Sequence, residues 1–310
     1  MNHRTLGRSG LSVSAIGLGC VDFGNRLDEA ASTKLVCAAL EEGITLFDTS
    51  DNYCEGRSEE ILGRALGSRR HESIINSKFT GSVGRYHADG SRSHVIRACE
   101  ESLRRLGTDY IDLYSLHHPD PTTPIEETLD ALGGLVRQGK VRYLGSSNLC
   151  GWQIADAEHT ARAKFGQHFV AAQMEWNLLC REVEQDIVPA CNHYGIGIMP
   201  FYPIASGLLT GKYRKGHRFP EGSRLASNQY YASVATPENL DRVERLIAFA
   251  ADRGRTILEL AMTWLAGRPG VVSILIGASR TEQVENNVAA LGDWLGDDDL
   301  VALDAIFSTD

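Results

Sequence analysis

Residues 47–66 read FDTSDNYCEGRSEEILGRAL, and three features follow one another within them. An apolar run ends at Asp48, Tyr53 lies five residues further on, and a helix is expected to begin at Ser58. A carboxylate at the end of a buried strand needs a partner, because an unpaired charge is costly away from water. The stretch therefore predicts a strand, a loop and a helix, with polar chemistry where the strand ends.

The same strand-then-helix unit recurs along the chain. Eight β-rich runs precede stretches with helical periodicity: AIGLGC (15–20), ITLFDT (44–49), SIINSKF (73–79), YIDLYSLHH (110–118), VRYLGSSN (141–148), FVAAQMEW (169–176), GIGIMPFY (195–202) and VVSILIGA (271–278). Most are continuously apolar, as parallel strands buried on both faces should be. Eight units predict an α/β fold, the (β/α)8 TIM barrel. A doubly wound open sheet is the alternative, but IGLGC does not supply the Gly-x-Gly-x-x-Gly that it would need.

The segments around these strands fit one domain over residues 1–310. Residues 1–14 predict a β-hairpin that turns at Gly7 to Gly10 and closes the bottom of the barrel. Residues 15–310 would form the barrel and C-terminal helices. One such helix has Val95, Ile96, Cys99, Leu103 and Leu106 at helical spacing, followed by Gly107 as its cap. The long polar stretch 208–237 interrupts the seventh unit, and a loop of that length is usually functional.

Composition limits the class of partner. The formal net charge is −9, with acids and bases interspersed, which argues against nucleic acid or an anionic membrane as the main partner. We find no apolar run of signal-peptide or membrane-spanning length, so a cytoplasmic location is expected. Seven cysteines without a Cys-x-x-Cys pair indicate neither a disulfide framework nor a zinc knuckle. The sequence does not indicate the oligomeric state.

Polar and aromatic residues stand where the predicted strands end, which is where such barrels carry their active sites. They are Asp48, Lys78, His117, His118, Ser147, Asn148 and Phe201, with Tyr53 on the loop after the second strand. Lys78 would lower the pKa of Tyr53 by stabilising its phenolate, and Asp48 would keep the lysine charged. His117 would orient a substrate oxygen. We expect proton transfer at this site.

A metal site is the alternative that adjacent histidines suggest. Neighbouring residues on a strand point to opposite faces, so His117 and His118 should not both face the barrel mouth. The sequence also has no His-x-His or His-Glu-x-x-His motif. No metal is expected.

The sequence resembles the aldo-keto reductase superfamily, in particular its bacterial-type NADPH-dependent members, nearly from end to end. The segments that carry the resemblance are FDTSDNYCEGRSEEILGRAL, INSKF, SLRRLGTDYIDLYSLHHPDP, TPIEETLDALGGLVRQGKVRYLGSSN, ASGLLTGKY and IGASRTEQVENN. The resemblance implies a metal-free barrel that binds extended NADPH and reduces an aldehyde or ketone. It implies a catalytic tetrad of Asp48, Tyr53, Lys78 and His117, with Tyr53 as general acid. His118 is the fallback for His117.

The resemblance also implies a cofactor site. Ser147, Asn148 and Gln173 would bind the nicotinamide carboxamide, and Phe201 would stack on the ring where the family usually has a tyrosine. Tyr202, Gly207, Leu208 and Lys212 would cover the pyrophosphate. At the adenosine end, Gly277 and Gln283 replace the usual lysine and arginine, which leaves Ser279 and Arg280 as the phosphate clamp, with Gln283 and Asn287 nearer the adenine. NADPH is therefore preferred, with NADH as the alternative.

Substrate and role stay open within this resemblance. The loops expected to set the substrate lie around Phe23, at TGSVGRYHADG (80–90) and in the seventh unit. Cys54 follows Tyr53 where a small residue is common, and it is a candidate redox-sensitive thiol. A regulatory subunit resembling the potassium-channel beta subunits is one alternative, which the lack of an obvious partner-binding extension disfavours. A specialised sugar or secondary-metabolite ketoreductase or dehydrogenase is another.

Overall fold

A computed structural model describes residues 1–79 and 89–307, and its centre is one parallel sheet. The eight strands of that sheet are β3 (Ile16–Gly19), β4 (Leu46–Asp48), β5 (Ile74–Phe79), β6 (Ile111–Leu116), β7 (Val141–Ser147), β8 (Phe169–Glu175), β9 (Gly197–Phe201) and β10 (Ile274–Ile276). Each predicted run contains one of them. Neighbouring strands pair in chain order, and β10 returns to pair with β3.

Residues just before β10 close the ring on its other side. Ile198 in β9 donates its backbone N–H to the Gly270 carbonyl at 2.8 Å, and its own carbonyl accepts from Val272 at 2.9 Å. The strands therefore form a nearly closed barrel, and the (β/α)8 prediction is confirmed. That residues 1–310 are a single domain stays a prediction.

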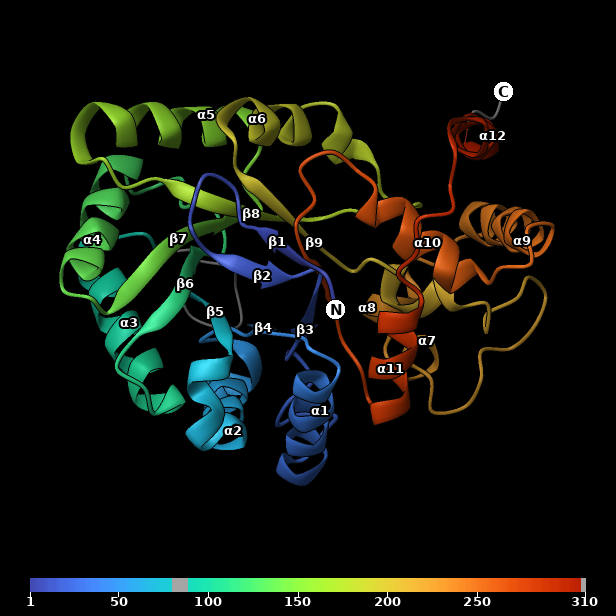
Figure 1. Cartoon of the computed structure of the whole chain (residues 1–310), viewed down its shortest axis with the longest axis horizontal. Helices are drawn as coiled ribbons and strands as arrows, with labels where there is room; N and C mark the ends of the chain where they lie inside the picture. Colours follow the sequence, from blue (N-terminus) through green and yellow to red (C-terminus); the bar gives the residue numbers. More distant parts are fainter. Residues whose placement is uncertain (80–88, 308–310) are drawn as a thin grey trace.

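Helices surround the barrel (Figure 1). Their bounds are α1 (Glu29–Glu41), α2 (Arg57–Leu66), α3 (Arg92–Leu106), α4 (Ile125–Arg137), α5 (Gly151–Thr160), α6 (Ile187–Tyr194), α7 (Arg224–Ser227), α8 (Gln229–Ala232), α9 (Pro237–Ala251), α10 (Ile257–Ala266), α11 (Thr281–Ala289) and α12 (Asp297–Phe307). The predicted cap of α3 is present, with Gly107 at φ 63°. Ile96, expected on the buried face of α3, is instead 39% exposed.

The side chains that point into the barrel are apolar at one end, here called the floor, and polar at the end where the strands finish, the mouth. The floor contains Leu46, Leu113 and Ala171. Two residues further along the same strands lie Asp48, Ser115 and Gln173, all buried. Because side chains two apart share a face of a strand, these polar groups sit directly above the apolar floor. The intervening residues face the helices.

The N-terminal hairpin lies at the floor end, as predicted. Strand β1 (His3–Thr5) pairs antiparallel with β2 (Ser12–Ser14). Leu6 and Val13 pack into the apolar floor of the barrel. At the turn, Gly7 has φ 54°, and a Cβ there would lie 2.2 Å from the Val170 carbonyl oxygen. Only glycine fits this close approach without strain.

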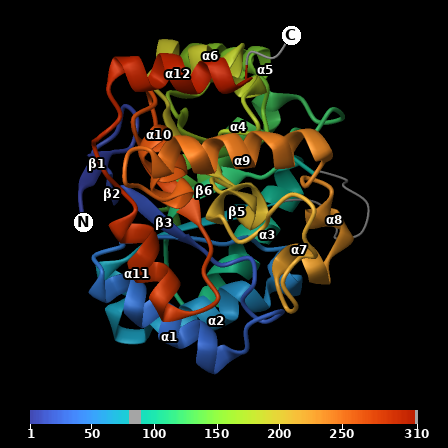
Figure 2. The same ribbon diagram turned by 90° about the vertical axis from the view of Figure 1, so that its right-hand side faces the viewer.

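The long seventh segment lies at the opposite end of the barrel. In Figure 2 the hairpin is at the left and the short helices α7 and α8 are at the right. Arg224 of α7 forms an ion pair with Asp22, on the loop after β3. Its guanidinium also lies 4.7 Å from the centre of the Tyr231 ring. This segment is therefore tied across the mouth.

Within the described ranges, none of the helices has the length and apolar character required to cross a membrane.

Candidate active site

A buried ion pair lies at the centre of the barrel mouth. Lys78 Nζ donates to Asp48 Oδ2 at 2.9 Å and to the Thr49 carbonyl oxygen at 2.7 Å. It also lies 3.1 Å from the Tyr53 hydroxyl oxygen. Lys78 is 1% exposed and Asp48 is 5% exposed. The pairing thus satisfies two charges that would otherwise be isolated from water.

Tyr53 reaches this pair from a tight turn. The turn Tyr53–Gly56 has left-handed backbone angles at Cys54 (φ 50°) and Glu55 (φ 56°). Residues other than glycine rarely adopt such angles, and those that do are concentrated at functional sites. Gly56, at φ 86°, completes the turn before α2 begins at Arg57, one residue before the predicted start. The turn aims the phenol back toward Lys78.

The pKa of Tyr53 differs from the sequence-based expectation. Part of its side chain reaches solvent, yet burial raises the pKa of the phenol by more than the nearby Lys78 ammonium lowers it. For Lys78, burial disfavours the charged form, but Asp48 and then Tyr53 outweigh burial and raise the pKa of the ammonium. Lys78 does lower the pKa of Tyr53, as expected, but burial outweighs this effect, so the expectation of a phenol more acidic than an ordinary one is wrong. At neutral pH the site holds a protonated phenol beside a charged lysine.

His117 lies against Tyr53 in a neutral state. Burial, followed by the charges of Lys78 and His118, lowers the pKa of His117 well below its ordinary range. The His117 and Tyr53 rings meet edge to face, with centroids 5.9 Å apart. Ser50 Oγ lies 3.1 Å from His117 Nδ1. Nε2 has no hydrogen-bond partner among residues 1–79 and 89–307, so it is the ring nitrogen left to face a substrate.

His117 and His118 do not point to opposite faces, as strand geometry led us to expect. Both residues follow the end of β6 at Leu116, where alternation no longer applies. Their rings stack with centroids 4.7 Å apart and planes 13° apart. Among residues 1–79 and 89–307, however, no group of three or more His, Cys, Asp or Glu side chains is placed to hold a metal ion.

The predicted carboxamide-binding residues adjoin the tetrad. Asn148, at φ 61°, donates its side-chain N–H to the His117 carbonyl at 2.9 Å and to Ser147 Oγ at 3.1 Å. Gln173 Nε2 donates to Asp48 Oδ1 at 2.7 Å. The Gln173 carbonyl accepts from the Asn148 backbone N–H at 3.0 Å. Three neighbouring strand ends thus bring these residues into one hydrogen-bonded group with the tetrad.

The other predicted cofactor residues form two further groups. Phe201 and Tyr202 lie at the end of β9, and Gly207 and Leu208 are buried in the following turn, Ala205–Thr210, with Lys212 exposed beyond it. Ser279 donates its N–H to Gln283 Oε1 at 2.7 Å and its hydroxyl to the same atom at 3.0 Å. Gly277 and Arg280 are exposed beside them, and Asn287 is buried. This last group is two strands from Asp48, because β10 pairs with β3 and β3 with β4.

Residues that the sequence analysis gave no role also belong to the site. Asn76 donates to Asp48 Oδ1 at 2.6 Å, and Ser115 donates to Asn76 Oδ1 at 2.8 Å. Ser50 and Thr49 contact His117 and Lys78, as described above. Asn76 lies two residues before Lys78, and Ser115 two before His117. A polar residue at that spacing inside a buried strand is the signal that could have identified them.

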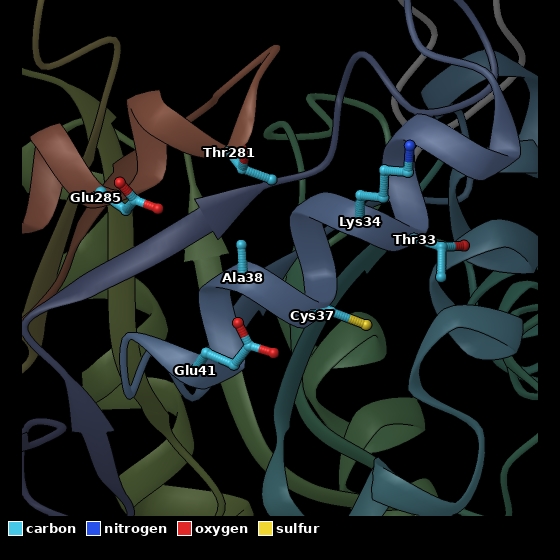
Figure 3. A pocket seen from close by; sticks show the side chains of 7 residues that line it. All are labelled: Thr33, Lys34, Cys37, Ala38, Glu41, Thr281 and Glu285. Carbon is cyan, nitrogen blue, oxygen red and sulfur yellow. The ribbon is translucent and has the colours of Figure 1, made fainter.

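Two other sequence-based expectations concern the rim of the mouth. Cys54 Sγ donates to the Gly24 carbonyl oxygen at 3.0 Å, so its thiol is engaged with the loop after β3. The predicted substrate loop at 80–90 lies outside the described residues except for Asp89 and Gly90. A hollow between α1 and α11 is lined by Lys34, Cys37 and Thr281 among others, and none of its lining residues belongs to the tetrad (Figure 3).

Comparison with known proteins identifies the family. The model of the aldo/keto reductase family matches residues 15–307. The chain belongs to the aldo/keto reductase family. It is therefore an oxidoreductase of a family that generally uses NADP(H) and acts on small carbonyl substrates.

Relatives of this reductase family member include proteins named for potassium channels. It is 37% identical to a probable voltage-gated potassium channel subunit beta of Oryza sativa subsp. japonica, over 94% of this chain and 91% of that protein. It is 36% identical to one of Arabidopsis thaliana, with the same coverage. A relative from Schizosaccharomyces pombe, also named as a voltage-gated potassium channel subunit beta, is 38% identical over 93% of this chain and 87% of that protein.

Proposed function

We propose that the protein is an NADPH-dependent reductase that converts an aldehyde or ketone to an alcohol, with Tyr53 as the general acid. The observation that carries this proposal is the contact of 3.1 Å between the Tyr53 hydroxyl and Lys78 Nζ. Lys78 is itself paired with Asp48. Family membership supports the oxidoreductase class. The substrate and the role of the tyrosine are our proposal.

The protonation states of the tetrad suit reduction. Tyr53 holds its proton at neutral pH and can donate it to a carbonyl oxygen that gains charge as the carbon is reduced. Lys78 stabilises the phenolate that remains after this transfer. His117, neutral and oriented through Ser50, can hydrogen-bond the same oxygen through Nε2.

The donor set of the mouth fits a dinucleotide. When bound, the nicotinamide would supply the hydride. Gln173 uses Nε2 to donate to Asp48, so its Oε1 would be the atom left to accept a carboxamide N–H. Ser147 and Asn148 would bind the same carboxamide, and Phe201 would cover the ring. Gly207, Leu208 and Lys212, next to Tyr202, would hold the pyrophosphate.

The adenosine end explains why we keep NADH as a second cofactor. Ser279 and Arg280 would hold a 2′-phosphate, beside Gly277, with Asn287 nearer the adenine. Gln283 is already engaged as the acceptor of two bonds from Ser279. Arg280 is thus the proposed cation on this segment. A single cation would bind the 2′-phosphate less strongly than two, and would therefore favour NADPH over NADH by a smaller margin.

A substrate panel tests the proposal. The purified protein is assayed with NADPH and with NADH against aliphatic and aromatic aldehydes, ketones and keto-sugars, following nicotinamide absorbance. We expect turnover with NADPH on at least one class, and a higher kcat/KM for NADPH than for NADH. Stoichiometric cofactor binding without turnover on any member would contradict the enzymatic role.

A second candidate function is a cofactor-binding regulatory subunit. The names of the plant and fission-yeast relatives favour it. Such a subunit would bind a membrane channel in a manner that depends on whether its nicotinamide is oxidised or reduced. Pull-down with the NADPH-loaded and NADP+-loaded protein tests it. A channel-type partner retained in one state only would support this function, whereas equal recovery in both states would contradict it.

A further inference from the structure

The two carboxylate oxygens of Asp48 have different partners. Oδ2 accepts from Lys78 at 2.9 Å. Oδ1 accepts from two neutral amides, Asn76 at 2.6 Å and Gln173 at 2.7 Å. Asn76 is completely buried, and Asp48 and Gln173 are 5% and 2% exposed. The plane of the carboxylate is therefore set by three donors on two other strands.

Asn76 is held in turn from the next strand. Its Oδ1 accepts the Ser115 hydroxyl at 2.8 Å. Since the amide oxygen is occupied by a donor, the amide nitrogen must face Asp48. Ser115 has room because residue 145 is a glycine, where a Cβ would lie 2.3 Å from Ser115 Oγ. Strands β5, β6 and β7 thus cooperate to orient one side chain.

We infer that Asn76 is a positioning residue for the reaction. Held by Ser115, it fixes Asp48 so that Oδ2 presents to Lys78, and through Lys78 it sets the position of the Tyr53 hydroxyl. This inference rests on the proposed reductase function. The inference also links Asn76 to the proposed cofactor site. The side-chain amide of Gln173, which would bind the nicotinamide, donates to the same Asp48 Oδ1 as Asn76 does.

The physical reason is that a buried carboxylate turns toward whatever donors remain. Without Asn76, one lone pair of a buried charge is left unsatisfied. The carboxylate can regain a donor only by rotating, and rotation moves Lys78 with it. Misplacement of a reacting group by about 1 Å can cost about 100-fold in rate.

The test uses two variants and a matched control in the full-length protein. Asn76→Leu keeps a similar side-chain volume but removes both hydrogen bonds. Ser115→Ala releases Asn76 more mildly, and it remains informative if Asn76→Leu does not fold. Ser273→Ala is the control, since Ser273 is also a completely buried serine of the barrel and its hydroxyl has no hydrogen-bond partner within the described residues.

The rate of the reaction and the geometry of the site are measured independently, by kinetics and by crystallography. We expect Asn76→Leu to lower kcat by about 10- to 100-fold, with KM and the NADPH dissociation constant changed less than about threefold. Ser115→Ala should lower kcat to a smaller extent, and Ser273→Ala should leave it unchanged. In cofactor-free crystals of Asn76→Leu and Ser115→Ala, the distance from Lys78 Nζ to the Tyr53 hydroxyl should exceed the present 3.1 Å.

Two outcomes would overturn the inference. One is an unchanged contact between residues 48, 78 and 53 in the variant crystals, whatever the activity. The other is an equal loss of kcat in Ser273→Ala and Ser115→Ala. If the unmodified protein reduces no carbonyl compound, the proposed function fails, and the crystallographic distances still decide whether Asn76 positions Asp48.

Discussion

Lys78 lies at the centre of the polar groups of the barrel mouth. It contacts the carboxylate of Asp48, a backbone carbonyl at Thr49 and the hydroxyl of Tyr53. Its charge is retained because Asp48 is opposite it, and that charge helps to keep His117 neutral. Burial and this one ammonium group together keep His117 neutral, whereas for Tyr53 burial outweighs the ammonium and keeps the phenol protonated.

These charge states predict how the reaction depends on pH. Tyr53 has a raised pKa, so it stays protonated throughout the neutral range, and His117 has a lowered pKa, so it stays unprotonated there. We expect kcat for reduction to be level between about pH 6 and pH 8. Alcohol oxidation needs the phenolate, so its rate should rise with pH and have its midpoint above about 10, the ordinary pKa of tyrosine, because burial raises the pKa of Tyr53. Steady-state rates in both directions check this.

A reduction rate that changes severalfold with a midpoint near neutral pH, in the unmodified protein but not in His117→Gln, would contradict the assignment. It would mean that His117 titrates in the range where the structure keeps it neutral.

At the scale of elements, the turn that carries Tyr53 depends on α2 and α3. Glu59 of α2 is completely buried, and it accepts from Arg105 of α3 at 2.6 Å and from Ser77 of β5 at 2.5 Å. The Arg105 side chain also lies against Gly56, where a Cβ would be 2.6 Å from Arg105 Cδ. One ion pair therefore links both helices to the turn and to the strand of Lys78.

Breaking that pair should destabilise the protein. Arg105→Met leaves a buried carboxylate without its cation, which typically costs about 3 to 5 kcal/mol. We expect a loss of about 3 kcal/mol in the free energy of unfolding, measured by denaturant titration. Arg104→Met is the matched control, because Arg104 is the exposed neighbour on the same helix. Equal stability of the two variants would show that the buried pair does not hold these elements together.

At the scale of the whole molecule, the two ends of the barrel have different tasks. The hairpin covers the apolar floor, and Arg4 fastens it by donating to the carbonyls of Ala266 at 3.0 Å and Val271 at 2.8 Å. The tetrad and the proposed cofactor residues lie at the other end. Substitutions at the floor end should therefore change the free energy of unfolding, and substitutions at the mouth should change the rate of reaction.

Gly7→Ala tests this separation. The left-handed backbone and the close approach to Val170 should cost about 2 kcal/mol or more in the free energy of unfolding, while kcat at a temperature where the protein is folded should change less than about twofold. Gly10→Ala is the control, since among the described residues a Cβ there would meet only the Tyr143 hydroxyl, at 3.7 Å. A lower kcat in fully folded Gly7→Ala would contradict the division between the two ends.

The sequence predicts most of the barrel because each strand is a short apolar run followed by a helix. It also predicts which residues meet at the mouth, since strand ends converge there. It does not predict the net pKa of Tyr53, which depends on how burial and charge balance in three dimensions. Nor does it reveal that His117 and His118 stack, because strand alternation stops at Leu116. Asn76 and Ser115 were missed because short polar residues inside a strand resemble packing residues.

The most direct test of the central claim is the turnover of Tyr53→Phe beside its affinity for NADPH. The variant keeps the aromatic ring, which lies 4.6 Å from Lys78 Nζ, and removes only the hydroxyl. We expect kcat for carbonyl reduction to fall by about 1,000-fold, within the range that general acids contribute, and the NADPH dissociation constant to change less than about threefold. Turnover above a tenth of the unmodified rate would show that another group donates the proton.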